Sequence, residues 1–145
     1  MTELAAINKL GNIRRSIKKY FTDHLTILDN INVYYDIAVT PLPNDSDVDE
    51  WVVIHFGEHM PASVSSLTLS LFLLTRRDIE GDDLADLYDK VQAYVHPGQI
   101  DLYDVEWNKI GGAKVYPKPN QGYTYTWDKT KIQKTFIELK WGANW

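Results

Sequence analysis

The stretch Val64–Thr75 reads VSSLTLSLFLLT, and its alternation decides the fold. Leucine occupies every second position from Leu67 to Leu73, and a serine or threonine separates successive leucines as far as Ser70. Successive side chains of a β-strand point to opposite faces, so the leucines share one face and the hydroxyl residues share the other. This pattern is typical of a strand in a sheet that has one covered face.

Two other segments carry apolar residues at helical spacing. Residues 3–24 are predicted to form an amphipathic helix, and a second helix is expected after Arg76-Arg77-Asp78, ending at Pro97-Gly98. Acidic residues gather at the start of the second helix, where they suit the helix dipole. The apolar positions are Ile7, Leu10, Ile13, Ile17, Tyr20 and Phe21 in the first helix, and Leu84, Leu87, Val91 and Val95 in the second.

Further strands are expected where runs rich in β-branched and aromatic residues alternate with turn residues. Gly57–Pro61 and Gly111-Gly112 are interpreted as breaks, and Pro117–Gly122 as the loop of a hairpin between Val115–Tyr116 and Tyr123–Trp127. The remaining expected strands are Ile31–Thr40, Trp51–Phe56, Gln99–Trp107 and Lys131–Trp141.

The order helix, strands, helix, strands predicts an α+β fold in which two helices pack on a mainly antiparallel sheet. We expect one domain over residues 1–145, because no linker or repeat divides the chain. Residues 107–145 are interpreted as a β-rich C-terminal extension, in the form of an extended hairpin or interface arm.

The amino-acid composition excludes several classes of protein and of site. The chain has 145 residues, of which 44% are hydrophobic and 24% charged, as in ordinary globular domains. It contains no cysteine, which excludes disulfide scaffolds, thiolate zinc sites and cysteine nucleophiles. No apolar run approaches the ~20 residues that span a bilayer, and the N-terminus lacks the pattern of a signal peptide. We therefore expect a protein that is assembled in the cytoplasm and has no membrane partner.

The net charge of −5 hides a division of the chain into three blocks. Residues 1–19 carry +4, residues 20–108 carry −14 and residues 109–145 carry +5. Asymmetry of this kind often marks an interaction surface. Two partners fit it: a polyanion at the basic ends, or a second copy of the chain that sets basic ends against an acidic middle.

Two motifs resemble metal sites but have the wrong context. His55-Phe56-Gly57-Glu58-His59 matches the H-x-x-E-H spacing of some metalloproteases, which requires a helix, yet it follows a predicted strand. Residues four apart on an extended chain lie ~13 Å from each other, too far to share one zinc ion. Asp45-Ser46-Asp47-Val48-Asp49 begins like a calcium loop but lacks the later glycine and glutamate, so it is interpreted as a solvated acidic loop.

Two other groups of residues suggest surfaces rather than catalytic sites. Asp82, Asp86 and Asp89 share the helix face opposite Leu84 and Leu87, which favours a solvated or partner-facing surface over paired catalytic carboxylates. In the C-terminal third, aromatic residues alternate with lysines, a pattern that can hold single-stranded nucleic acid or simply pack across strands. The sequence pI of 5.3 argues against nucleic acid. No nucleophile-elbow, phosphate-loop or dinucleotide motif occurs, so no catalytic residue, metal or cofactor is assigned.

Three stretches resemble the tail terminator proteins of long-tailed bacteriophages. They are the basic amphipathic helix that contains IRRSIKKYF at Ile13–Phe21, the strand at Ser66–Thr75 leading into Arg76-Arg77-Asp78, and the helix at Leu84–Val91 followed by Ile100–Asp104. Together they cover about two-thirds of the chain and match in pattern, without an invariant motif. The long aromatic extension departs from the compact members of that family.

The resemblance implies a structural virion subunit rather than an enzyme, without a cofactor. Such a subunit would form a homo-oligomeric ring, hexameric in the family, which caps the tail tube protein, stops tube growth and offers a docking surface to the head–tail connector. Related neck, head–tail joining and tube subunits remain alternatives. A single-stranded nucleic-acid-binding protein and a small enzyme of another family are alternatives from other classes.

A ring requires two different patches on each subunit, and the charge blocks supply them. Trp141 and Trp145 are interpreted as interface rather than core residues, because they lie at a chain end with little packing between them. The candidate interface residues are Arg14, Arg15, Lys18, Lys19, Asp82, Asp86, Asp89, Tyr123, Tyr125, Trp127, Trp141 and Trp145.

Overall fold

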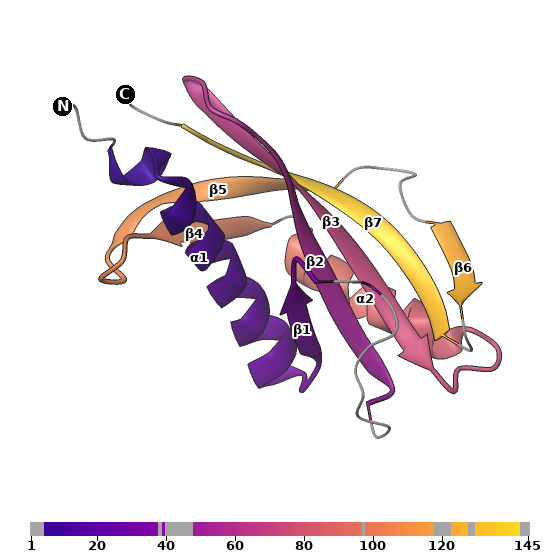
Figure 1. The fold of residues 1–145 in the computed structure, drawn as a ribbon. Helices are drawn as coiled ribbons and strands as arrows, with labels where there is room; N and C mark the ends of the chain where they lie inside the picture. The colour runs from indigo at the N-terminus through magenta and orange to yellow at the C-terminus, as the bar shows by residue number, and fades with distance from the viewer. Residues whose placement is uncertain are drawn as a thin grey trace.

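The computed structural model describes residues 5–37, 39, 48–96, 98–117, 123–127 and 130–142, with residues 123–127 described by their backbone alone. One seven-stranded sheet runs through the molecule in the order β1-β2-β3-β7-β5-β4, and β6 pairs with β7 beside this path (Figure 1). The β1–β2 pair is parallel and every other pair is antiparallel. The strands are β1 (Asn32–Tyr35), β2 (Glu50–Met60), β3 (Val64–Arg76), β4 (Gln99–Tyr103), β5 (Lys109–Pro117), β6 (Tyr123–Trp127) and β7 (Thr130–Gly142).

Strand β3 lies at the centre of this sheet, as its alternating sequence predicts. The four leucines from Leu67 to Leu73 are buried in a large inner core, between the sheet and the two helices. The intervening residues from Ser66 to Ser70 are only partly buried. From Phe72 onward the second face is covered as well, by a smaller outer cluster. That cluster contains Trp51, Val53, Phe72, Leu74 and Ile132.

Both predicted helices are present, with shifted ends in the first. Helix α1 (Leu10–Phe21) follows a short 3₁₀ turn, η1 (Ala6–Asn8), and continues as a π-helix, η2 (Thr22–Leu28). The extended backbone of Lys9 separates η1 from α1, so the expected helix over 3–24 starts later and ends later. Helix α2 (Asp82–Val95) buries all four of its predicted apolar residues in the inner core. The predicted α+β class, with two helices on a mainly antiparallel sheet, is confirmed.

Helix α1 sits between the two edge strands of the curled sheet (Figure 1). On one side, the Ser16 hydroxyl accepts a hydrogen bond from the backbone N–H of Tyr103 in β4, with N and Oγ 2.8 Å apart. On the other side, the Tyr35 hydroxyl of β1 donates to the Lys18 carbonyl at 2.9 Å and contacts the Thr22 hydroxyl at 3.0 Å. An uncovered sheet edge invites pairing with other chains, and α1 partly covers the edges at β1 and β4, while β6 forms a further edge beside β7.

Three expectations about the later strands are wrong. Strand β2 continues through Gly57 to Met60, and β5 runs through Gly111-Gly112, although both glycine sites were expected to break the chain. A Cβ at Gly111 would lie 2.7 Å from Cδ1 of Ile7, so this glycine admits the N-terminal segment against the strand. Strand β6 pairs with β7 rather than with β5.

The β-rich C-terminal part is integrated into the sheet and does not form an arm. Strand β7 lies between β3 and β5 and pairs with β3 along its entire length, from Thr130 to Gly142. Residues 107–145 therefore supply the central strand β7, which forms an antiparallel pair with the neighbouring β6. No helix in the described ranges is long and apolar enough to span a membrane.

Asp78 fixes the connection between β3 and α2. Its carboxylate accepts hydrogen bonds from the backbone N–H groups of Gly81, Asp83 and Leu84 and from the Thr75 hydroxyl, at 2.9–3.2 Å. Burial acts to raise the pKa of Asp78, but these four hydrogen bonds outweigh it and hold the pKa below its usual value. The ionised side chain thus satisfies donors at the start of α2 that lack helical partners.

We predict that Asp78→Asn lowers the free energy of unfolding by about 2 kcal/mol at neutral pH, because an amide cannot accept all four hydrogen bonds. The folded pKa is lowered, so the carboxylate stabilises the fold above its unfolded pKa and loses this effect as the pH falls. Urea unfolding should show the gap between wild type and variant shrinking below about pH 4. A gap that is independent of pH would contradict this role.

Candidate interface on the two helices

The basic residues predicted at the interface lie on α1, in two different environments. Arg14 makes an ion pair with Asp36 at 2.7 Å, and its guanidinium lies 3.9 Å from the centre of the Phe56 ring. Asp36 also accepts the backbone N–H of Phe56, and these hydrogen bonds lower its pKa although burial acts to raise it. Arg14 therefore holds α1 against β2, which is a structural role within the subunit.

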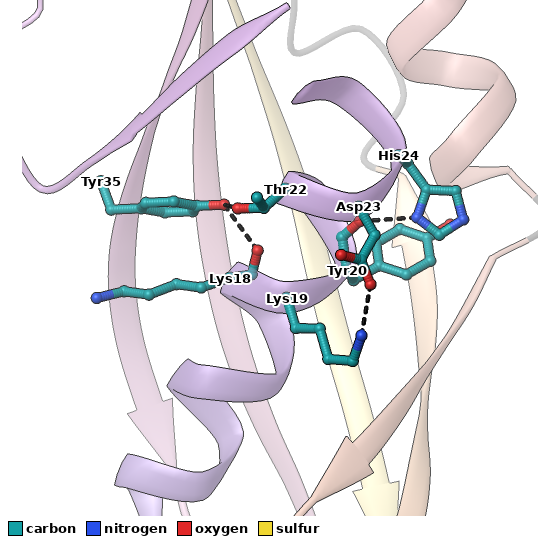
Figure 2. Close-up of polar contacts among 7 residues, drawn as sticks. All are labelled: Lys18, Lys19, Tyr20, Thr22, Asp23, His24 and Tyr35. Carbon is teal, nitrogen blue, oxygen red and sulfur yellow. Dashed lines mark hydrogen bonds and ion pairs between the residues drawn. The ribbon is translucent and has the colours of Figure 1, made fainter. Parts of the chain in front are cut away.

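Lys18 and Lys19 extend from α1 in different directions (Figure 2). Lys19 pairs with Asp23 at 2.6 Å, and this hydrogen bond raises the pKa of Lys19. The Lys18 ammonium lies 5.5 Å from the centre of the Tyr35 ring and has no carboxylate at ion-pair distance among the described residues. The charge of Lys19 is thus compensated within α1 and η2, whereas that of Lys18 is available to a partner.

An open groove of about 560 Å³ runs along this basic side of α1. Its lining residues are Arg15, Lys18, Lys19, Thr22, Asp23 and Trp107. Trp107 comes from the turn between β4 and β5, and its side chain is half-exposed. Sequence reasoning missed Trp107, placing it at the end of a strand; the flanking Asp104 and Asn108, which are typical turn residues, were the available signal.

The predicted acidic surface is present on α2. Asp82, Asp86 and Asp89 are all exposed, on the helix side opposite Leu84 and Leu87. Within the part of the chain that the structure describes, none of these three aspartates forms an ion pair. Basic α1 and acidic α2 thus present unlike charges that are not neutralised against each other inside one subunit.

Trp141 is a core residue, which corrects its prediction as an interface residue. Its side chain is 3% exposed, its ring stacks on His59 at 5.9 Å, and its Nε1 donates to the Ile7 carbonyl at 3.2 Å. The partner segment lies at the other end of the chain, so local sequence gave no sign of this burial. Trp145 lies outside the described residues.

The other C-terminal aromatic residues lie in β6. The backbone of Tyr123–Trp127 pairs with Thr130–Lys134 of β7, which confirms the predicted strand. Tyr123, Tyr125 and Trp127 occupy alternate positions of that strand, and the predicted interface role of their side chains stays a prediction.

The two histidines of the H-x-x-E-H sequence lie on opposite faces of the sheet. His55 contacts Phe72 of the outer cluster, with ring centres 4.9 Å apart, whereas His59 stacks on Trp141 of the inner core. A bulge between Phe56 and His59 shifts the register and produces this reversal. No group of three potential metal-ligating side chains occurs among the described residues. The acidic loop at 45–49 lies mostly outside them, and its Asp49 pairs with Arg77.

Comparisons with known proteins describe the fold and leave the function open. No family model and no curated protein matches this chain. A solved structure whose name states no function aligns with 95% of this chain and 97% of its own chain, with a TM-score of 0.63 and 7% sequence identity. At that identity the likeness shows a shared fold alone, so any function must be argued from the surface.

We predict that Trp141→Ala lowers the free energy of unfolding by about 3–5 kcal/mol, because it leaves a large cavity in the inner core. Trp107→Ala is the matched control, and it should cost much less, because Trp107 is half-exposed and lies outside both core clusters. Equilibrium unfolding in urea, followed by circular dichroism, measures both. A Trp141→Ala variant as stable as the control would restore the interface interpretation.

Proposed function

We propose that the protein is a structural subunit of a bacteriophage tail, which forms a ring on the tail tube, stops its growth and presents a docking surface to the head–tail connector. One observation carries the proposal: among the described residues, Arg15 and Lys18 in the groove on α1 have no acidic partner, and the exposed aspartates of α2 have no basic partner. The resemblance of three sequence stretches to tail terminator proteins supports the same function. The virion would be its final location, after assembly in the cytoplasm.

Two unlike patches on one subunit suit a head-to-tail contact, in which the basic patch of one copy meets the acidic patch of the next. A rotation that closes gives a ring, and one that does not close gives a filament. Complementary charge also fixes the register of such contacts and suppresses wrong ones. A hexameric ring is the form that the resemblance implies.

The partly covered sheet edges favour this type of contact over strand pairing. Ser16 hydrogen-bonds to β4, and β1 is tied to α1 through Tyr35, so a neighbouring strand would have to displace α1 to pair with either edge at these positions. At β1 and β4, neighbouring subunits would therefore meet through side chains on the helices and turns, while β6 forms a further edge beside β7. A neck or tube subunit would share this property and is an alternative within the same class.

A nucleic-acid-binding function is the second candidate, and the groove on α1 is the observation that favours it. Arg15 and Lys18 beside the exposed Trp107 are the residue types that hold a phosphate backbone and stack on a base. The net charge of −5 and the acidic face of α2 oppose this function, because they repel a polyanion.

We predict that purified protein, alone or with tail tubes, assembles into rings that weaken as salt rises. Raising the ionic strength from 0.1 M to 1 M shortens the Debye length from ~10 Å to ~3 Å and screens contacts between exposed charges. Analytical sedimentation at both salt concentrations, with negative-stain imaging of the low-salt sample, measures this. A monomer at every concentration and salt level, with no tail tube able to assemble it, would refute the proposal.

A further inference from the structure

We infer that the groove on α1 receives the exposed acidic face of α2 from a second copy of this chain, with Trp107 as the anchor of the contact. This inference rests on the proposed function, because it names the surfaces through which neighbouring subunits would meet. Three features of the described residues lead to it: two uncompensated cations, one exposed tryptophan in a rigid turn, and one unpaired acidic helix face.

The cations are Arg15 and Lys18, which lie one helical turn apart on α1. Arg15 is exposed, and its guanidinium donates to the amide oxygen of Asn12 at 2.6 Å, a contact that leaves its charge uncompensated. Neither residue has an acidic partner among the residues described, in contrast to Arg14 and Lys19. A carboxylate entering the groove would therefore meet two positive charges that no described carboxylate neutralises, while Asp23 in the same groove is already paired with Lys19.

Trp107 is held in place by its turn rather than by packing in a core cluster. Its φ of +64° is unfavourable for a bulky residue and is maintained by Asp104, whose side chain accepts the backbone N–H groups of Glu106 and Asn108 at 2.9 Å. The backbone N–H of Trp107 donates to the Asp104 carbonyl at 3.0 Å. Trp107 is 51% exposed, and an exposed tryptophan adds little to the stability of the fold but is well placed to bind a partner.

The acidic face of α2 fits this groove in both charge and spacing. Asp82, Asp86 and Asp89 lie at i, i+4 and i+7, so two of them are always about one turn apart, as Arg15 and Lys18 are. Ala85 is exposed beside them, and its small side chain leaves room for an indole against the helix. Because each copy carries both the groove and the acidic face, the same contact can repeat from subunit to subunit.

Charge reversal tests the contact in the intact protein. Arg15→Glu/Lys18→Glu and Asp82→Lys/Asp86→Lys should each raise the concentration needed for assembly by about tenfold or more, and Trp107→Ala should do the same. An equimolar mixture of the two charge-reversed proteins should assemble again, because every contact in an alternating assembly then joins opposite charges. The matched controls are Lys114→Glu, Glu58→Lys and Ile79→Ala, which change exposed residues outside the contact.

The outcomes separate this inference from the proposed function. If wild-type protein forms rings and the groove and α2 variants form them equally well, the inference is wrong and the proposed function stands. If wild-type protein never assembles, even with tail tubes, the proposed function itself fails. Loss of oligonucleotide binding in Arg15→Glu/Lys18→Glu, with assembly unchanged, would assign the groove to nucleic acid. Thermal melting followed by circular dichroism must show that each variant is folded. For the charge-reversed pair, reassembly of the mixture also shows that both proteins are folded.

Discussion

The position of α1 between β1 and β4 is the constraint on which the rest of the structure depends. The helix buries Ile13, Ile17 and Phe21 in the inner core while Ser16 and the Lys18 carbonyl bond to the two edge strands. Because α1 partly covers the edges at β1 and β4, the curled sheet does not offer these two edges freely to other chains. The same position of α1 turns its basic side outward. One packing arrangement therefore both covers the β1 and β4 edges and exposes the groove.

Sequence patterns predicted the elements whose causes are local. The alternation at Val64–Thr75 and the apolar spacing in residues 84–95 each lie within one element, and both were correct. The errors came from contacts between distant segments. Gly111 looks like a chain break, but it accommodates Ile7, and Trp141 looks like a loose end, but it bonds to the Ile7 carbonyl. Of the candidate site, the charged residues could be predicted from periodicity, whereas Trp107 could not, because its exposure depends on the Asp104 turn.

The partners of each charged residue within the subunit show which charges in the groove remain available to a neighbouring molecule. Arg14 and Lys19 belong to the predicted basic interface, yet both are compensated within the subunit, by Asp36 and Asp23. Of the four basic residues predicted at the interface, Arg15 and Lys18 have no acidic partner among the described residues, and they lie beside an exposed tryptophan. The candidate interface therefore consists of two cationic side chains and one tryptophan, rather than of a whole basic segment. It is this narrower surface that makes head-to-tail assembly a specific proposal.

The most direct measurement is a cross-link between the groove and α2 of different subunits. The chain has no cysteine, so Lys18→Cys and Asp86→Cys each introduce a single thiol. A short bis-maleimide reagent bridges thiols even where a disulfide, which needs Cα atoms within about 7 Å, cannot form. Mixing the two variants should give a heterodimer joined through positions 18 and 86, and the double variant should give covalent rings of one size. Assembled rings that show no 18–86 cross-link, or no more than a Lys114→Cys control gives with Asp86→Cys, would contradict the account.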